Sequence, residues 1–406
     1  MSKFSLAPAP VIILTGANGG VGYGICQRLL FQLCQLNAPD SLPQHFASNV
    51  KSQEKAPVGY RGVTLIMACR NKQRASAART KLLNWLENQR STLRGLPNYD
   101  EDYTSTFIAN CNVHIHELDL ASVSSVLRFS AEIRKTYPYV SHLLLNAGVA
   151  SFVGIDWIQC FKQLASGPIH AITVPAFYTQ HIGEISGDNL GWVWQSNVFG
   201  HFVLFRELEE TLKKSPFEST RVIWCSSLEA SSHFYDSADW QLIKTDHSYE
   251  AAKYQIDLIA NCLDLIALQN SETTKVTRHF VGEPGVCSTS ISKALVSGLL
   301  DEVKVIAFYI ARLFGSPHHT ILPWCAAVTF VHLVLAPLCY LPIFLNNDPS
   351  KPVRFSAQTG RWGDEYVGLT EVKEWEKHKE EGYALIKKCD KLYESFKQAE
   401  AVTQDI

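Results

Sequence analysis

The sequence lacks the features that mark nucleic-acid-binding and secreted disulfide-rich proteins. Its net charge is −2 and it has no basic block, so no nucleic-acid partner is expected. Its eleven cysteines show no Cys-x-x-Cys spacing, and an odd number does not suit a secreted disulfide framework. No signal peptide is recognised ahead of the first apolar run, Val11–Leu14, and no metal site is expected. We therefore expect a reducing, cytosol-facing setting.

A glycine-rich turn follows that apolar run. Val11–Leu14 has the length and continuous apolarity of a strand buried on both faces, and residues 25–30 have the pattern of a helix. Glycines between a strand and a helix permit a tight turn and let the backbone approach a pyrophosphate at the positive end of the helix. The sequence therefore predicts a dinucleotide site that uses Thr15, Gly16, Asn18, Gly20 and Gly22.

Tyr249 and Lys253 are the candidate chemical groups. Residues four apart on a helix share one face, so the phenol and the ammonium are expected to lie side by side. A nearby positive charge favours the phenolate, and Lys253 is therefore expected to lower the tyrosine pKa from its reference of ~10. Such a pair suits proton transfer in an alcohol–ketone reaction, although an exposed helical pair has the same spacing.

These motifs together resemble the short-chain dehydrogenase/reductase family, whose glycine motif has the form Thr-Gly-x-x-x-Gly-x-Gly. The resemblance covers residues 11 to about 295 and implies an α/β fold with a Rossmann-like doubly wound parallel sheet. A hydrophobic C-terminal helical extension follows. Further matching positions are Asp119 beside the adenine ring, Asn146 of Asn-Ala-Gly, Asn197 of the catalytic set, Ser226 and Ser227 after a strand, and Val286 and Ser288 beneath the nicotinamide.

The resemblance also implies the roles of the site residues. Tyr249 donates a proton to the substrate carbonyl oxygen, and Lys253 holds the cofactor ribose as well as acting on the tyrosine. Ser227 hydrogen-bonds the carbonyl oxygen and stabilises the developing charge. Asn197 completes a water-mediated proton relay through Lys253.

The choice of serine stays open. The family's serine lies about a dozen residues before the tyrosine, whereas here the gap is longer because residues 229–247 read as an insertion. Ser227 is preferred because it ends a strand, and rigid elements place catalytic groups best. Ser226 is the fallback, and counting back by the usual spacing would give Ser237 or Asp236.

The residue after the second expected strand indicates which cofactor binds. In NAD-preferring dehydrogenases, an acidic residue ~20 positions after the glycines binds the ribose 2′-hydroxyl. Here Arg70 follows the strand Val63–Cys69, and a guanidinium there can bind a 2′-phosphate and stack on adenine. We therefore expect NADPH. Lys72 and Arg74 are equally explained as the solvated start of a helix.

Residues 303–345 contain the longest apolar stretch. Residues 321–345 include no Asp, Glu, Lys or Arg and reach the ~20 apolar residues that crossing a bilayer requires. Trp324 and Tyr340 suit the membrane interfaces. Upstream, residues 303–314 form an apolar helical pattern with isolated basic residues. A membrane-embedded segment is favoured over a buried helical cover of the substrate pocket, since soluble core helices rarely lack charge over such a length.

The sequence divides into three expected parts. They are a reductase domain (1–300, with insertions at about 37–62 and 229–247), a hydrophobic membrane-associated or substrate-cover segment (301–346), and a C-terminal loop and amphipathic helix (347–406). Within the last part, residues 354–368 are expected to form an ordered loop and residues 370–401 a solvated helix with one apolar face.

The overall layout resembles the 3-keto-steroid reductases of fungal sterol biosynthesis. That resemblance implies NADPH-dependent reduction of a sterol 3-ketone to the 3β-hydroxyl, with Tyr249 as proton donor, at the endoplasmic reticulum membrane or lipid droplets among other sterol-biosynthesis enzymes. The active site would face the cytosol. Two alternatives remain: a reductase of the same mechanism for a 17-ketosteroid, retinal or 3-ketoacyl substrate, and a membrane scaffold for a sterol-pathway complex.

Overall fold

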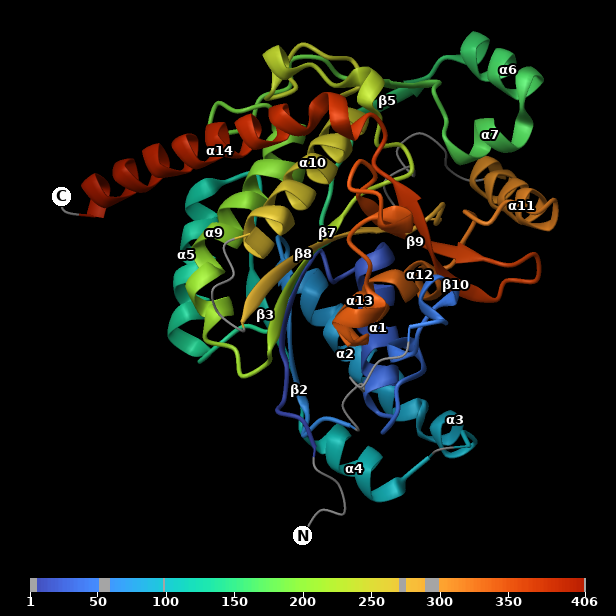
Figure 1. The fold of residues 1–406 in the computed structure, drawn as a ribbon, viewed down its shortest axis with the longest axis vertical. Helices are drawn as coiled ribbons and strands as arrows, with labels where there is room; N and C mark the ends of the chain where they lie inside the picture. The colour runs from blue at the N-terminus through green and yellow to red at the C-terminus, as the bar shows by residue number, and fades with distance from the viewer. Residues whose placement is uncertain (1–5, 51–58, 98, 270–274, 289–298, 405–406) are drawn as a thin grey trace.

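The computed structural model describes residues 6–50, 59–97, 99–269, 275–288 and 299–404. Within these ranges, an eight-stranded sheet has the order β10-β9-β8-β7-β4-β1-β2-β3 and is parallel except for β10, which runs antiparallel to β9 (Figure 1). The expected Rossmann-like doubly wound fold is thereby confirmed. The strands are β1 (Val11–Thr15), β2 (Val63–Cys69), β3 (Cys111–Glu117), β4 (His142–Leu145), β7 (Ser219–Cys225), β8 (Val276–Glu283), β9 (Val353–Thr359) and β10 (Glu365–Glu371).

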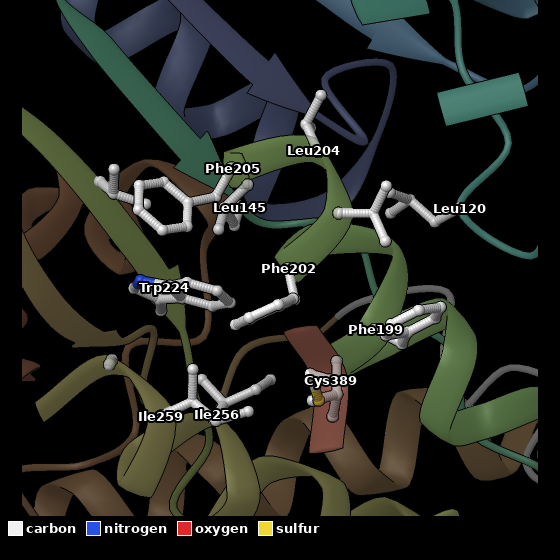
Figure 2. Packing of buried hydrophobic residues seen from close by; sticks show 14 of the residues in the cluster. Leu120, Leu145, Phe199, Phe202, Leu204, Phe205, Trp224, Ile256, Ile259 and Cys389 are labelled. Atoms are coloured by element: carbon white, nitrogen blue, oxygen red, sulfur yellow. The ribbon is translucent and has the colours of Figure 1, made fainter. Parts of the chain in front are cut away.

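Apolar helix faces cover one side of the sheet. These helices are α5 (Val123–Thr136), α9 (Gly200–Lys213), α10 (Ser248–Gln269) and α14 (Trp375–Gln404). Figure 2 shows Phe202 and Phe205 of α9 packed against Trp224 of β7 and Ile256 of α10. The expected apolar face of α14 is also present: Leu385, Ile386, Cys389 and Tyr393 are buried in the same core.

The other side of the sheet is covered by α1 (Gly20–Leu33) and α2 (Lys72–Asn88), together with part of the C-terminal extension. Residues 321–345 do not form one helix but break into α12 (Pro323–Ala326), α13 (Val328–Leu335) and irregular turns. Every residue of α13 is buried, in a core shared with α1 and the sheet. Gly24 of α1 allows this packing, because a Cβ there would lie 2.3 Å from the Pro323 carbonyl oxygen.

The favoured membrane-embedded interpretation is therefore corrected for residues 325–336, which are buried within the protein. The alternative is confirmed only in this burial, because none of these residues is among the described residues that line the cavity. Their lack of charge suits a helix enclosed by α1 on one side and by β8 and β9 on the other. Among the described helices, none combines the length and the apolarity needed to cross a membrane.

The C-terminal part also differs from expectation. Residues 354–368, expected as a loop, belong to β9, β10 and the turn between them, and β9 extends the sheet by pairing with β8. The apolar pattern of a buried strand is interrupted in β9 by a buried charge. The Arg354 guanidinium lies 2.9 Å from a Glu283 carboxylate oxygen and 3.2 Å from a carboxylate oxygen of Asp257. Such a paired cation occupies an inward position where an apolar side chain would be expected.

The two expected insertions pack against the domain where they are described. In residues 37–62, of which 51–58 lie outside the described residues, Asp40 pairs with the Arg28 guanidinium of α1 at 2.5 Å.

The remaining elements are η1 (Pro39–Ser41), η2 (His45–Ala47), α3 (Arg90–Arg94), α4 (Glu101–Ala109), β5 (Phe152–Ile155), α6 (Trp157–Ser166), α7 (Pro168–Thr173), β6 (Tyr178–Gln180), α8 (Trp192–Trp194), η3 (Gln195–Phe199), η4 (Ser232–Phe234), η5 (Ser237–Asp239), α11 (Leu299–Leu313), η7 (Leu338–Tyr340) and η8 (Leu345–Asn347).

Candidate active site

A cavity of about 500 Å³ opens at the carboxyl ends of the central strands, where ligands bind in open α/β sheets. Two groups of its lining residues differ in composition. One group, here called the glycine wall, comes from residues 15–22 and 146–148. The other group, here called the apolar wall, consists of Phe152, Ile172, Pro175, Tyr178 and Phe308.

The glycine wall is held by hydrogen bonds between β1 and the turn after β4. The Thr15 hydroxyl accepts hydrogen bonds from the backbone amides of Asn146 at 2.9 Å and Ala147 at 3.0 Å, and the Asn146 side-chain amide donates to the Thr15 carbonyl at 2.9 Å. Gly16 has φ +69°, a conformation that favours glycine. A Cβ at Gly22 would lie 2.3 Å from the Gly16 carbonyl oxygen, so this turn cannot be as tight with any other residue.

The glycine wall includes the N-terminus of α1. Gly19 caps the helix without a side-chain hydrogen bond, and the first turn contains no acidic residue. Backbone amides at such an end favour an anion. A Cβ at Gly19 would meet nothing within 4 Å, in contrast to the crowded Gly22. Gly20 and Asn18 also line the cavity at this end.

Three further predicted cofactor residues line the glycine side: Arg70, Asp119 and Asn146. Arg70 is exposed and follows β2 directly, as predicted. Arg74 also lines the cavity. From the sequence, Arg74 was explained equally well as part of the solvated start of a helix. Lys72 instead lies 3.1 Å from a Glu117 carboxylate oxygen on the outside, where both side chains are largely exposed.

Tyr249 and Lys253 lie on α10 and line the cavity together, and both are buried. The Lys253 ammonium donates a hydrogen bond to the Cys225 carbonyl at 2.7 Å and lies 5.7 Å from the centre of the Tyr249 ring. The expected lowering of the tyrosine pKa is corrected: burial raises the pKa of Tyr249, and the nearby Glu229 raises it further. Burial also lowers the pKa of Lys253, because desolvation disfavours the charged ammonium.

The two candidate serines have different surroundings. Ser226 is almost fully buried, and its hydroxyl donates to the Lys253 carbonyl at 3.4 Å, back towards α10. The Ser227 hydroxyl accepts a hydrogen bond from the Glu229 amide at 3.1 Å and also bonds the Tyr249 phenol, which lowers the pKa of that phenol. The structure therefore brings Ser227 together with Tyr249. The alternatives Ser237 and Asp236 lie on or beside η5 and are not among the described residues that line the cavity.

Asn197 lies behind the cavity in the π-helical turn η3. Its side-chain oxygen accepts from the Val149 amide at 2.8 Å, and its amide donates to the Val149 carbonyl at 2.8 Å. A Cβ at Gly148 would lie 3.4 Å from the Asn197 oxygen and 3.7 Å from the Lys253 ammonium, so a glycine lets the chain pass between them. Val286 lines the cavity, whereas Ser288 is not among the described lining residues.

Two residues that the sequence did not single out complete the site. The Gln180 side-chain oxygen, on β6, accepts hydrogen bonds from the Ser248 hydroxyl and the Tyr249 amide, both at 3.0 Å, and thereby fixes the start of α10. Glu229 lines the cavity with one carboxyl oxygen enclosed and without a hydrogen-bond partner. Burial, and then the charge of Glu250, raise the pKa of Glu229 to about 8.

No protein-family model matches the chain. Similar curated proteins include the 3-keto-steroid reductase erg27 of Schizosaccharomyces pombe, 29% identical over 89% of this chain and 90% of its own. The 3-keto-steroid reductase of Debaryomyces hansenii is 26% identical over 89% and 88%. Among solved structures, the RhlG/NADP active-site complex of Pseudomonas aeruginosa covers 84% of this chain and 95% of its own at 14% identity, with a TM-score of 0.49.

The site and these relatives define a class of protein. A parallel sheet, a glycine turn at its carboxyl edge and a tyrosine, lysine and serine in one cavity occur together with similarity to reductases along nine-tenths of the chain. The chain is therefore similar to the short-chain dehydrogenase/reductase family, as its sequence motifs indicate. It is a reductase dependent on NAD(P)(H).

Proposed function

We propose that the protein uses NADPH to reduce the 3-keto group of a sterol intermediate to the 3β-hydroxyl. The observation that carries this proposal is the cavity itself, which Tyr249, Lys253 and Ser227 line together with the glycine wall and the apolar wall. The substrate class is supported by relatives named 3-keto-steroid reductases, which align along nearly the whole chain.

The glycine wall fits NADPH. The uncapped start of α1 and the close approach permitted by Gly22 suit a pyrophosphate, and Arg70 and Arg74 suit a 2′-phosphate. When bound, NADPH would supply a hydride to the carbonyl carbon of the ketone. The apolar wall suits the body of a rigid hydrocarbon, because its lining offers aromatic and aliphatic side chains.

The proton comes from the protein. As the carbonyl carbon gains the hydride, the C=O π electrons move to oxygen, and the Tyr249 phenol donates its proton there to give the alcohol. The raised pKa of Tyr249 keeps the phenol protonated at neutral pH. Ser227 donates a hydrogen bond to the same oxygen, while Lys253 and Asn197 route a replacement proton to the tyrosine through water. Gln180 positions the tyrosine by fixing the first turn of α10.

The test is NADPH oxidation with a 4-demethylated 3-keto sterol by the wild type and by Tyr249→Phe. We expect turnover to fall about 10²–10⁴-fold in the variant while NADPH binding, followed by fluorescence, is unchanged. Turnover with a 17-ketosteroid, retinal or a 3-ketoacyl substrate but not with the sterol would move the proposal to another lipid ketone. NADPH binding without turnover on any ketone would favour the scaffold alternative.

The proposal includes a cellular place. Sterol ketones partition into membranes, so the enzyme is proposed to work at the endoplasmic reticulum membrane or lipid droplets, with its site facing the cytosol and other sterol-biosynthesis enzymes nearby. Fluorescence microscopy of the tagged protein beside markers for each compartment tests it. A diffuse signal with no enrichment at either compartment would contradict it.

A further inference from the structure

One buried arginine of the C-terminal region contacts three segments that lead into the cavity. The Arg354 guanidinium, on β9, donates a hydrogen bond to the Ser227 carbonyl at 3.3 Å. It donates another to a carboxylate oxygen of Asp257 on α10 at 3.2 Å. It also lies 2.9 Å from a carboxylate oxygen of Glu283, the last residue of β8. The segment after β7, the helix α10 and the end of β8 therefore meet at a single side chain.

Two of these segments carry further site residues. On α10, Tyr249, Lys253 and Asp257 are spaced four residues apart, so they share one face of the helix. Burial lowers the pKa of Lys253, and the charge of Asp257 is among those that oppose this shift. β8 ends at Glu283, and residues 284–287 directly after it line the cavity. The contacts of Arg354 thus reach the backbone on which the site is built.

The charges around Arg354 are enclosed by protein. Arg354 is 5% exposed, Asp257 1% and Glu283 0%. The Thr370 hydroxyl of β10 donates a hydrogen bond to the second Glu283 oxygen at 3.3 Å. Removing ions from water is costly, so a buried ion pair is weak evidence of stabilisation. A guanidinium, however, presents five N–H groups in a rigid planar fork, which lets it fix several acceptors in one geometry.

A second buried ion pair joins the same strand and helix away from the cavity. Arg278 of β8 donates to both carboxylate oxygens of Asp264 on α10, at 2.8 and 2.9 Å, and both side chains are buried. Asp264 lies eleven residues beyond Lys253, which is about 16 Å along a helix. Neither Arg278 nor Asp264 is among the described residues that line the cavity. This pair is a matched reference for a purely structural connection between α10 and β8.

We propose that Arg354 is a positioning residue for the reduction, which holds the Ser227 segment, α10 and the end of β8 in the geometry that aims the Ser227 hydroxyl and the Tyr249 phenol at one carbonyl oxygen. Arg354 is not among the described residues that line the cavity, so it acts through the groups that it holds. The reaction that it serves rests on the proposed function, whereas the positioning does not depend on which ketone is reduced.

The test compares Arg354→Met with Arg278→Met. Both variants leave buried carboxylates without their cation, so both should unfold at a lower urea concentration than the wild type. In Arg354→Met, kcat with the ketone that the wild type reduces should fall about 10–100-fold, because a displacement of ~1 Å can cost ~100-fold in rate. In Arg278→Met, kcat should stay the same. The dissociation constant for NADPH should stay the same in both, because the glycine wall comes from other segments.

Hydrogen exchange at residues 226–230 gives a readout that needs no substrate. The Ser226 amide donates to the Gly282 carbonyl at 2.9 Å, and the Ala230 amide donates to the Ser227 carbonyl at 3.1 Å. These amides should exchange faster in Arg354→Met than in Arg278→Met, measured by mass spectrometry at equal temperature and pH. A wild type that reduces no ketone would contradict the proposed function, and the exchange comparison would still decide whether Arg354 holds this segment.

Arg354→Met/Glu283→Gln serves if the single variant does not fold. It removes one carboxylate together with the cation, so the formal charge of the cluster is unchanged. It should regain stability but keep the low kcat, because the hydrogen bond to the Ser227 carbonyl is still missing. The proposal is overturned by a folded Arg354 variant with the wild-type kcat, by an equal loss of kcat in Arg278→Met, or by exchange at 226–230 that is no faster than in Arg278→Met.

Discussion

The two walls of the cavity are built in different ways. The glycine wall comes from two short contiguous segments, 15–22 and 146–148, fixed by hydrogen bonds between backbone groups and the side chains of Thr15 and Asn146. The apolar wall is assembled from side chains of β5, α7 and β6, all within residues 152–180, and from Phe308 of α11, which lies more than a hundred residues further along the chain. The shape of the glycine wall is set by its backbone, whereas the shape of the apolar wall is set by side chains that substitution can change.

This difference matches the two tasks proposed for the walls. A cofactor that is the same in every turnover is best held by backbone amides and glycines, whose geometry tolerates little change. A substrate body of hydrocarbon is held by apolar contact, which discriminates related ligands by only about 1–3 kcal/mol per methylene. Substitutions in the two walls should therefore differ in both size and kind of effect.

The largest effect is expected from Gly22→Ala in the glycine wall. Its Cβ would lie 2.3 Å from the Gly16 carbonyl oxygen and 2.7 Å from the Asn146 side chain, so the backbone of the turn must shift. We expect the free energy of unfolding to fall by about 1–3 kcal/mol and NADPH affinity to fall at least tenfold. Chemical denaturation and NADPH titration measure the two quantities. Gly19→Ala is the control for stability, because its Cβ meets no protein atom within 4 Å; a similar loss of stability there would mean that clash is not the cause.

Arg70→Glu tests whether the same wall selects the cofactor. Charge-assisted hydrogen bonds to a 2′-phosphate contribute about 1.5–3 kcal/mol, so the ratio of kcat/KM for NADPH over NADH should fall roughly 10–100-fold. Lys72→Glu is the comparison, because Lys72 pairs with Glu117 on the outside and should leave the ratio nearly unchanged. If Arg70→Glu preserves the preference, Arg74 becomes the candidate, since it also lines the cavity.

Ile172→Ala makes the corresponding change in the apolar wall. Losing three carbons of partly buried hydrocarbon should raise KM for the ketone about tenfold, from roughly 1–2 kcal/mol of lost apolar contact. The dissociation constant for NADPH should stay the same, because Ile172 lies on α7, away from the glycine turn. Steady-state kinetics with varied ketone measure KM, and NADPH titration measures the dissociation constant of the cofactor. A matching loss of NADPH affinity would show that the walls are not independent.

The sequence predicted the glycine wall because its chemistry is local. A strand, a glycine turn and a helix occur within about twenty residues, and Arg70 directly ends the next strand. The apolar wall was not predicted residue by residue, since none of its members carries a motif. Gln180 and Glu229 were missed for the same reason: a lone amide and a lone carboxyl in loops or short strands have no pattern until the fold brings them to α10.

The two apolar stretches of the C-terminal region show a second limit of prediction from the sequence alone. Residues 328–335 contain no Asp, Glu, Lys or Arg and are fully buried, whereas the more charged α11 exposes Ile306 and Ile310. Uniform apolarity was taken to favour a membrane, but a helix enclosed on all sides by protein has the same composition. Only tertiary packing distinguishes a membrane-embedded helix from a helix buried in the protein. The close approach of Pro323 to Gly24 could not be inferred from either segment alone.

Glu229 interacts electrostatically with Tyr178 of the apolar wall and with Lys253, and its substitution should give the smallest and most specific effect. Its pKa of about 8 in the folded protein, against an ordinary 4.5, means that the folded state keeps a proton that the unfolded chain has released. Stability should therefore fall as pH rises from about 4.5 to 8, by at most about 1.4 kcal/mol per pH unit. The charged and titratable groups around it are Glu250, Lys253, Tyr249 and Tyr178.

Glu229→Gln replaces the protonated carboxyl by a neutral group of the same shape and should remove this part of the pH dependence. Urea unfolding of wild type and variant at pH 5, 6.5 and 8 measures it, and the variant should gain stability relative to the wild type as pH rises. Glu376→Gln, on the exposed first turn of α14, controls for the loss of one carboxylate. Curves that stay parallel would mean that Glu229 ionises normally and that its surroundings are more open to water than its enclosed oxygen indicates.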